Sequence, residues 1–334
     1  MSNNQIKVML LSRESKNKNS IWSNQCPNNE LKWNNCTFIT NPYDADYDWF
    51  VVRNDVPYIF KNKIKLNCDT QRTILFTSEP SSITRYGKKF VNQFGFLLSS
   101  QEKEILPHTN AIRSPTGNVW HYGKSYDQLR NEKPIIKNKI ISTVCSTKQM
   151  KHTKHAERLK FTKNLKKDLS CLDLYGKGHN YIKNKYDAID PYKYHLVIEN
   201  HKSKYHFTEK ITDAFLGYSI PIYYGCTNIN DYFPINSYIE IDINNYEESL
   251  NIIKNIINDP DEYKKRLDAV IEARRRVLEI YNLPAMIADI IEKSELEGIK
   301  LLNKKIIYSR RIMRLKNPND FISFAFWRMK NLLK

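Results

Sequence analysis

Residues 194–210 have the sequence YHLVIENHKSKYHFTEK, which joins a strand-like run, a short polar loop and the start of a helix. The run 195–198 is mostly apolar without strict alternation, as expected of a parallel strand that is covered on both faces. Thr208 is a favourable helix N-cap, so a helix is predicted over 208–216. A strand, loop and helix in this order bring polar groups to the edge of a sheet, where α/β folds bind ligands.

The alternation of strands and helices continues around this segment. Apolar runs of strand length flank it, and a helical pattern at 153–169 separates the first two of them. This alternation predicts a parallel, doubly wound sheet. The predicted strands of this half of the chain are residues 140–145, 172–175, 195–198, 220–224 and 238–241.

The first third of the chain contains another series of short apolar runs between polar stretches, and it predicts a second α/β domain. Two domains of ordinary size account for the 334 residues. Domains of this type bind ligands at the carboxyl ends of their strands, so we expect a cleft there. The predicted strands of the first domain are residues 6–11, 37–40, 49–52, 73–77 and 94–98.

We expect a first domain over residues 1–133 and a second domain over 134–300. Asp259 and Pro260 predict the start of the helix that closes the second domain, with Asp259 as its cap. Beyond these domains, residues 301–334 form a basic tail.

The tail at 301–334 has nine Lys or Arg residues and the single acid Asp320. Basic segments bind anionic lipid headgroups, and aromatic side chains lie at the boundary of the hydrocarbon layer. We expect this tail to pack partly on the first domain and to contact an anionic membrane surface. Its aromatic residues are Phe321, Phe324, Phe326 and Trp327.

Composition limits the class of protein. With 41% hydrophobic and 27% charged residues the chain is predicted to be globular, and its net charge of +17 indicates an anionic partner. The six cysteines are widely spaced without a C-x-x-C pair, and no secretory signal precedes them, so reduced thiols and a cytoplasmic location are expected. No run of 18 apolar residues is present, so any membrane contact is predicted to be peripheral.

The helix predicted to begin at Thr208 carries chemistry at its first turn. Its N-terminus offers unpaired N–H groups and partial positive charge, which suit the diphosphate of a nucleotide sugar. Lys210 adds a full positive charge, and the Glu209 carboxylate can accept two hydroxyls of a ribose or hexose. The alternative is an ordinary helix cap with a lysine that faces water.

The order of residues around this turn resembles a known family. The E-N pair is followed eight residues later by T-E-K, and then by Gly217, Ile220-Pro221, Gly225 and Pro234-x-x-Ser237. This pattern is similar to the donor site of glycosyltransferase family ten, the fucosyltransferases, of bacterial type. The resemblance implies a GT-B fold, in which two Rossmann-like domains face a cleft. It also implies inverting transfer of fucose from GDP-fucose to a hydroxyl of lipopolysaccharide, capsule or a related glycan.

The resemblance also implies roles for individual residues. Arg158 falls where relatives carry an arginine that contacts the donor phosphates, and the sequence FTSEP at 76–80 resembles the family's acidic motif, which makes Glu79 the expected general base. Such a base is needed because the attacking hydroxyl must lose its proton, and positive charge stabilises the leaving diphosphate without a metal or other cofactor. The donor contacts expected from the resemblance are Arg158, Glu199, Asn200, His206, Thr208, Glu209 and Lys210.

Some features leave alternatives open. His201 and His206 stand where better-known relatives have serine and tyrosine, so another nucleotide-sugar donor is the alternative within the class. The basic charge and 12% aromatic residues allow a nucleic-acid-binding protein, but no recognition motif is present and we expect no nucleic-acid partner. The acidic repeat at 44–48 resembles a metal motif of other glycosyltransferases and is interpreted as a solvated loop, so no metal site is predicted.

Overall fold

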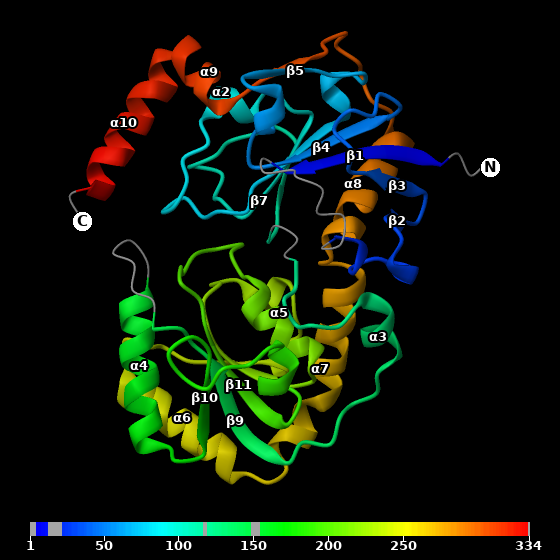
Figure 1. The fold of residues 1–334 in the computed structure, drawn as a ribbon. Helices are drawn as coiled ribbons and strands as arrows, with labels where there is room; N and C mark the ends of the chain where they lie inside the picture. Colours follow the sequence, from blue (N-terminus) through cyan, green and yellow to red (C-terminus); the bar gives the residue numbers. More distant parts are fainter. Residues whose placement is uncertain (1–4, 13–21, 116–118, 148–153, 333–334) are drawn as a thin grey trace. The chain divides into compact units, whose positions relative to one another are not determined.

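The computed structural model describes residues 5–12, 22–115, 119–147 and 154–332 (Figure 1). The chain forms two compact units. Unit 1 consists of Met1–Gly117 together with Asn282–Lys334, and unit 2 consists of Asn118–Tyr281. Thr153 of the predicted helix and Lys334 of the predicted tail lie outside the described residues.

Unit 1 is built on a seven-stranded sheet with the order β2-β3-β1-β4-β6-β7-β8, in which only the β2/β3 pair is antiparallel. Alternate residues of its central strands pack in one apolar core with Tyr86, Phe90 and Ile307. The strands are β1 (Ile6–Ser12), β2 (Lys32–Trp33), β3 (Cys36–Ile39), β4 (Trp49–Arg53), β6 (Thr73–Phe76), β7 (Phe96–Ser99) and β8 (Ala111–Arg113). The helices of this unit are α2 (Lys88–Val91), α8 (Leu283–Glu297), α9 (Arg310–Lys316) and α10 (Pro318–Leu332).

Unit 2 is built on a five-stranded parallel sheet with the order β10-β9-β11-β12-β13. The chain leaves β9 toward β10 and leaves β11 toward β12, so right-handed crossovers put α4 and α5 on opposite faces. α4 packs on α6 through Phe161 and Tyr246, whereas α5 packs on α7. The strands are β9 (Lys139–Val144), β10 (Leu172–Tyr175), β11 (Tyr192–Ile198), β12 (Ile220–Tyr224) and β13 (Ile239–Glu240). The helices are α3 (Tyr126–Asn131), α4 (His155–Asp168), α5 (Glu209–Leu216), α6 (Tyr246–Asn258) and α7 (Glu262–Glu279).

The strand order has one consequence for ligand binding. In unit 2 the second strand lies beside the first on one side, and the third lies on the other side, so the connections diverge between β9 and β11. Unit 1 repeats this arrangement, with divergence between β1 and β4. Divergence leaves a crevice at the carboxyl ends of the two central strands, which is where ligands bind in open α/β sheets.

The boundaries between the two units differ from the expected boundaries after residues 133 and 300. Helix α8 belongs to unit 1, because Glu295 accepts a hydrogen bond from Trp49 Nε1 at 2.8 Å and pairs with Arg72 at 3.1 Å. Conversely, the segment before residue 134 joins unit 2, where Tyr126 donates a hydrogen bond to Glu279 at 2.7 Å.

All ten strands predicted from apolar runs are present, and the helices predicted at 153–169 and 208–216 are α4 and α5. The predicted start of the helix at Asp259 was wrong. Asp259 caps the C-terminus of α6, and α7 begins at Glu262 with Asp261 as its N-cap residue. The carboxylate of Asp259 accepts a hydrogen bond from the Asp261 N–H at 2.9 Å, so the Asp259-Pro260 turn connects two helices.

The predicted tail at 301–334 packs partly on unit 1, as expected. Its strand β14 (Ile306–Tyr308) pairs antiparallel with β5 (Lys63–Lys65), and Trp327 Nε1 donates to the Ser81 carbonyl at 3.0 Å. Phe324 stacks on Trp327 and lies under the guanidinium of Arg314. No helix among the described residues is long and apolar enough to cross a membrane.

Candidate functional site

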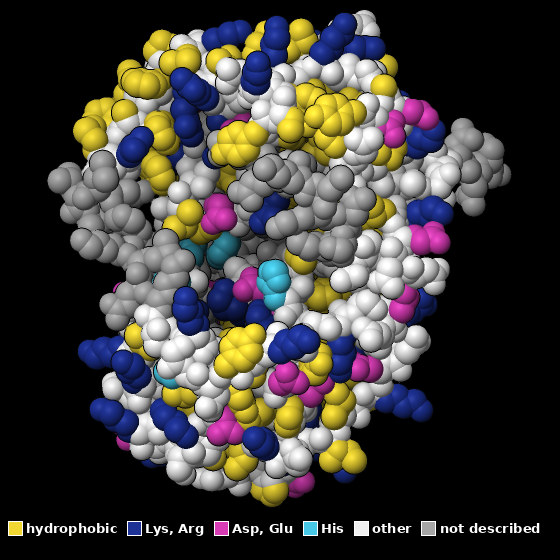
Figure 2. Space-filling model, in the orientation of Figure 1, with side chains coloured by type: hydrophobic (Ala, Val, Ile, Leu, Met, Phe, Trp, Pro, Cys, Tyr) yellow, Lys and Arg dark blue, Asp and Glu magenta, His cyan; other side chains and the backbone are white. Residues whose placement is uncertain are grey.

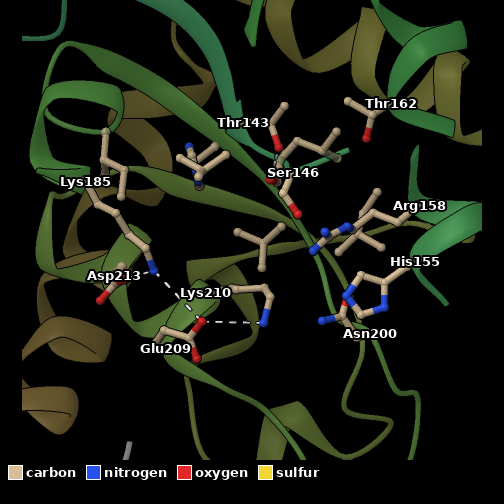
Figure 3. Close-up of a pocket in the computed structure, with 16 residues that line it drawn as sticks. Thr143, Ser146, His155, Arg158, Thr162, Lys185, Asn200, Glu209, Lys210 and Asp213 are labelled. Carbon is tan, nitrogen blue, oxygen red and sulfur yellow. Dashed lines mark hydrogen bonds and ion pairs between the residues drawn. The ribbon is translucent and has the colours of Figure 1, made fainter. Parts of the chain in front are cut away.

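A pocket opens in unit 2 at the carboxyl ends of β9 and β11, the point where the sheet connections diverge (Figure 3). Its walls come from those two strand ends, from the first turns of α5, from α4 and from the segment before β11. Figure 3 shows Arg158, His155 and Asn200 on one side, Lys185 and Asp213 on the other, and Lys210 between them. The fold therefore brings residues from five separate segments to one crevice.

The start of α5 is fixed by a buried carboxylate. Glu199 is fully buried after β11, and its Oε1 accepts a hydrogen bond from the backbone N–H of Thr208 at 2.8 Å. The Thr208 hydroxyl, the N-cap group of α5, lies 2.9 Å from the same oxygen. Lys210 Nζ lies 2.9 Å from this hydroxyl and 3.2 Å from Glu199 Oε2. Glu199 and Thr208 thus position the Lys210 ammonium and do not line the pocket themselves.

Charged groups form a chain along one wall of the pocket. Lys185 Nζ lies 2.6 Å from Asp213 Oδ2 and 3.9 Å from Glu209 Oε1, and Lys210 Nζ lies 3.5 Å from the same Glu209 oxygen. With Arg158 on the opposite wall, the lining contains three cations and two carboxylates. Because the Glu199 carboxylate lies behind Lys210, the ammonium is held in place before any ligand binds.

The electrostatics keep Glu209 and Lys210 charged. Burial disfavours the Glu209 carboxylate, but the ammonium groups of Lys210 and Lys185 outweigh it and lower the pKa of Glu209 to about 2. Burial also disfavours the Lys210 cation, yet the Glu199 and Glu209 carboxylates raise the pKa of Lys210 above its ordinary value. An anionic ligand therefore meets a permanently charged lysine.

The pocket collects buried polar atoms without partners. Among the described residues, Arg158 Nε, Thr162 Oγ1, Asn200 Oδ1 and Asp213 Oδ1 are buried and have no hydrogen-bond partner, and all four residues line this pocket. A buried polar group without a partner costs about 1–3 kcal/mol. The concentration of such groups at one crevice indicates that a polar ligand supplies the missing partners.

The predicted donor residues divide into two groups. Arg158, Asn200, Glu209 and Lys210 line the pocket together. His206 is buried outside its lining, with its ring centroid 5.5 Å from that of His201, and burial together with His201 and Lys210 lowers the pKa of His206 to about 3.

Lys185 and Asp213 were not predicted from the sequence. Asp213 lies four residues after Glu209 and therefore on the same face of α5, a spacing that sequence analysis could have used. Lys185 reaches the pocket from the short helical turn Lys185–Ala188 and carries no comparable signal.

The glycines of the predicted pattern have a steric reason. A Cβ on Gly225 would lie 2.6 Å from Glu199 Cγ and 2.3 Å from the Tyr223 hydroxyl. A Cβ on Gly217 would lie 2.4 Å from Ile189 Cγ2. Only glycine lets the segment after β12 approach the buried Glu199, and only glycine closes the turn after α5 this tightly.

A second pocket lies in unit 1 at the carboxyl ends of β1, β4 and β6. It contains Glu79, the predicted base, whose pKa is raised by burial while the Arg53 guanidinium opposes the shift. Beside it, Asn54 binds Ser78 through both its side-chain atoms, at 2.7 and 2.8 Å, and accepts a hydrogen bond from Tyr86 at 2.6 Å. The carboxylate of Glu79 thus shares the pocket with polar side chains that are already hydrogen-bonded to one another.

The acidic repeat at 44–48 is a loop feature. Asp46 pairs with Lys7, and Asp48 accepts a hydrogen bond from the Lys7 backbone N–H at 2.8 Å. Within the described part of the chain, no three His, Cys, Asp or Glu side chains are grouped in a way that could hold a metal ion.

The chain is similar to fucosyltransferases in sequence and in fold. Residues 135–268 match the model of glycosyltransferase family 10 (fucosyltransferase), C-terminal part. A stretch of 78 residues is 36% identical to the alpha-(1,3)-fucosyltransferase FucT of Helicobacter pylori, covering 23% of this chain and 16% of that protein.

Two solved structures share the architecture. A crystal structure of alpha1,3-fucosyltransferase is 17% identical, with a TM-score of 0.52 over 84% of this chain and 93% of the other. Another, with GDP, is also 17% identical, with a TM-score of 0.50 over 85% of this chain and 94% of the other. These likenesses confirm the predicted GT-B fold class. The match over residues 135–268 lies in the half of the chain where the sequence resembles the predicted family, and it supports a glycosyltransferase of the fucosyltransferase type.

Proposed function

We propose that this protein is an inverting fucosyltransferase that transfers fucose from GDP-fucose to a hydroxyl of a cell-surface glycan such as lipopolysaccharide or capsule. The observation that carries the proposal is the unit 2 pocket, where Arg158, Lys185 and Lys210 surround a crevice with unpartnered polar atoms. Lys210 in the first turn of α5, with Arg158 from α4 and Lys185 from the turn before β11, suits a diphosphate, because both the charges and the helix dipole favour an anion.

The proposed reaction is a single displacement. The acceptor oxygen forms a bond to the anomeric carbon of the sugar while the bond from that carbon to the diphosphate breaks. Glu79 takes the proton of the attacking hydroxyl, and Arg158 and Lys210 stabilise the charge that develops on the leaving diphosphate. Under this proposal the chain's own cations do the work for which other transferases use a metal, so no cofactor is required.

Glu209 is proposed to bind hydroxyls of the donor. Its low pKa keeps it an acceptor at every physiological pH, which suits two adjacent hydroxyls of a ribose. Asn200 offers an unpartnered Oδ1 to the same ligand. Glu199, Thr208 and His206 do not line the pocket, and we assign to Glu199 and Thr208 the positioning of Lys210.

The nucleotide is tested by thermal stability. GDP, UDP and CMP, each with its sugar conjugates, are added to the full chain, and a ligand at 100 times its dissociation constant stabilises the fold by about 2.7 kcal/mol. We expect GDP and GDP-fucose to raise the melting temperature most. A larger shift with UDP or CMP would favour another donor, and tight, salt-sensitive binding of oligonucleotides without any nucleotide effect would favour a nucleic-acid-binding protein.

The C-terminal helix is proposed to bring the enzyme to a membrane surface that carries a lipid-linked acceptor. On α10, Ile322, Phe326 and Met329 are at least half exposed and lie at helical spacing on one face. Figure 2 shows hydrophobic and basic side chains interleaved over this region. Trp327 is bonded to Ser81 and Phe324 stacks on Trp327, and Arg310 pairs with Asp55, so the contact surface is smaller than the whole predicted tail.

Sedimentation with vesicles tests this surface. A chain that ends at Asn317 keeps β14 and α9 but loses α10 with its apolar face. We expect the full chain to pellet with anionic vesicles, less so as salt rises, and the shortened chain to stay in the supernatant. Replacement of Ile322, Phe326 and Met329 by serine should have the same effect without a change in charge. Equal pelleting of all three proteins would rule the surface out.

A further inference from the structure

We propose that the unit 1 pocket binds an acceptor that carries an anionic group, a carboxylate or a phosphate, close to the hydroxyl that reacts, and that Arg53 is the residue that binds this group. The proposal rests on the proposed function because it treats the ligand of this pocket as the acceptor. The binding of an acidic sugar to the pocket can nevertheless be measured without any transfer.

The first observation is a charged group for which the described residues supply no counter-ion. Arg53 ends β4 and lines the pocket, yet it makes no ion pair and no side-chain hydrogen bond with the described residues. A half-buried guanidinium has five N–H donors in a planar fork and is satisfied best by a carboxylate or a phosphate. The side chain of Glu79 shares the pocket and interacts with Arg53 through charge, but no ion pair forms between them.

The second observation is that the rest of the pocket is already built. Asn54, Ser78 and Tyr86 satisfy one another, as described above. Arg310 enters from the segment after β14 and is fixed by Asp55, through its backbone N–H at 3.0 Å and its Nε at 3.0 Å. Because Asp55 binds the Nε of Arg310, the two Nη groups remain available as hydrogen-bond donors to a ligand in this pocket.

The charges of the lining decide between a neutral and an anionic ligand. The pocket holds two guanidinium groups and one carboxylate, and the Asp55 carboxylate neutralises Arg310. If Glu79 is reserved for the reacting hydroxyl, Arg53 is the one lining charge that the described residues leave without an opposite partner. A neutral sugar would leave the Arg53 guanidinium without an opposite charge, whereas the anionic group of an acidic sugar would form two charge-assisted hydrogen bonds with this guanidinium.

Direct binding tests the proposal. Methyl glucoside, methyl glucuronide and methyl glucoside 6-phosphate share one ring and differ only at C6, and their dissociation constants are measured by ligand-observed NMR on the full chain with GDP present. We expect at least one acidic glycoside to bind about tenfold or more tightly than the neutral one. The carboxylate and phosphate arms show which of the two anions the pocket prefers.

Variants locate the effect. Arg53→Gln should remove the preference for the acidic glycosides and leave the binding of the neutral glycoside as it is, while Arg53→Lys should retain part of the preference. Lys103→Gln removes one exposed positive charge elsewhere in unit 1 and should change nothing. Equal affinity for all three glycosides in the native protein, or a preference that survives Arg53→Gln, overturns the proposal. Failure of GDP-fucose transfer with this preference intact would instead count against the proposed function.

Discussion

The two pockets occupy the same place in two similar sheets, but they hold different chemistry. In unit 2, the crevice between β9 and β11 gathers Arg158, Lys185 and Lys210 around polar atoms that have no partner. In unit 1, the crevice beside β1 and β4 contains the carboxylate of Glu79 within a network in which most polar atoms are already paired. The strand order determines where a ligand binds, and the side chains at the strand ends determine what it does there.

The difference predicts a division of labour. Cations and unpartnered groups in unit 2 favour tight binding of an anionic ligand, so most of the donor affinity should come from that unit. A half-buried carboxylate with a raised pKa adds little to binding but is suited to accept a proton. Substitutions in unit 1 should therefore act on turnover, and substitutions in unit 2 should act on both binding and turnover.

The largest expected effect is that of Glu79→Gln. The amide keeps the size of the side chain but cannot accept the proton, so kcat should fall by about 10²- to 10⁴-fold. The dissociation constant of the donor, measured by calorimetry, should stay unchanged because Glu79 lies in the other unit. Near-native turnover would require another base among the carboxylates of unit 1, and a loss of donor affinity in proportion would contradict the division of labour.

The next effect concerns the cations of unit 2. Lys210→Ala and Arg158→Ala each remove a charged hydrogen-bond donor to the diphosphate, so each should weaken donor binding about tenfold or more and slow turnover as well. Lys160→Ala is the matched control, because Lys160 lies on α4 with Arg158 but is exposed. If both pocket variants bind GDP as the native protein does, this pocket is not the donor site.

The elements that the sequence predicts best are those whose own residues decide their structure. Strand β12 is a continuous apolar run and β11 ends in one at residues 196–198, while Thr208 caps α5 with its own side chain. Strands β2, β5, β8 and β14 are only two or three residues long, so their pattern cannot be told from that of a loop. Helix α8 was not predicted, and only the contacts of Glu295 in unit 1 show which sheet it covers.

The candidate site follows the same rule. Glu209 and Lys210 were predicted because they stand in the first turn of a helix whose start is visible in the sequence. The position of Glu199 behind Lys210 depends on the backbone of Thr208, and the reach of Lys185 depends on the folded sheet, so neither follows from spacing. The sequence does not distinguish Arg53 from other residues at strand ends, and only the structure shows that it shares a pocket with Glu79.

The smallest expected effect is on the pH dependence of turnover. Glu79 acts only when it is ionised, so the rate should fall as pH decreases through its pKa, which burial raises above the ordinary value of 4.5 and which Arg53 opposes. Arg53→Gln removes that opposition, so the acidic limb of kcat/KM with a neutral acceptor should move to higher pH, and the rate below it should drop by up to about tenfold. Glu209, with its pKa of about 2, should contribute no limb in the same range. Profiles of the native protein, Arg53→Gln and Lys103→Gln decide the matter, because a limb at the same pH in all three would mean that Arg53 does not act on the base.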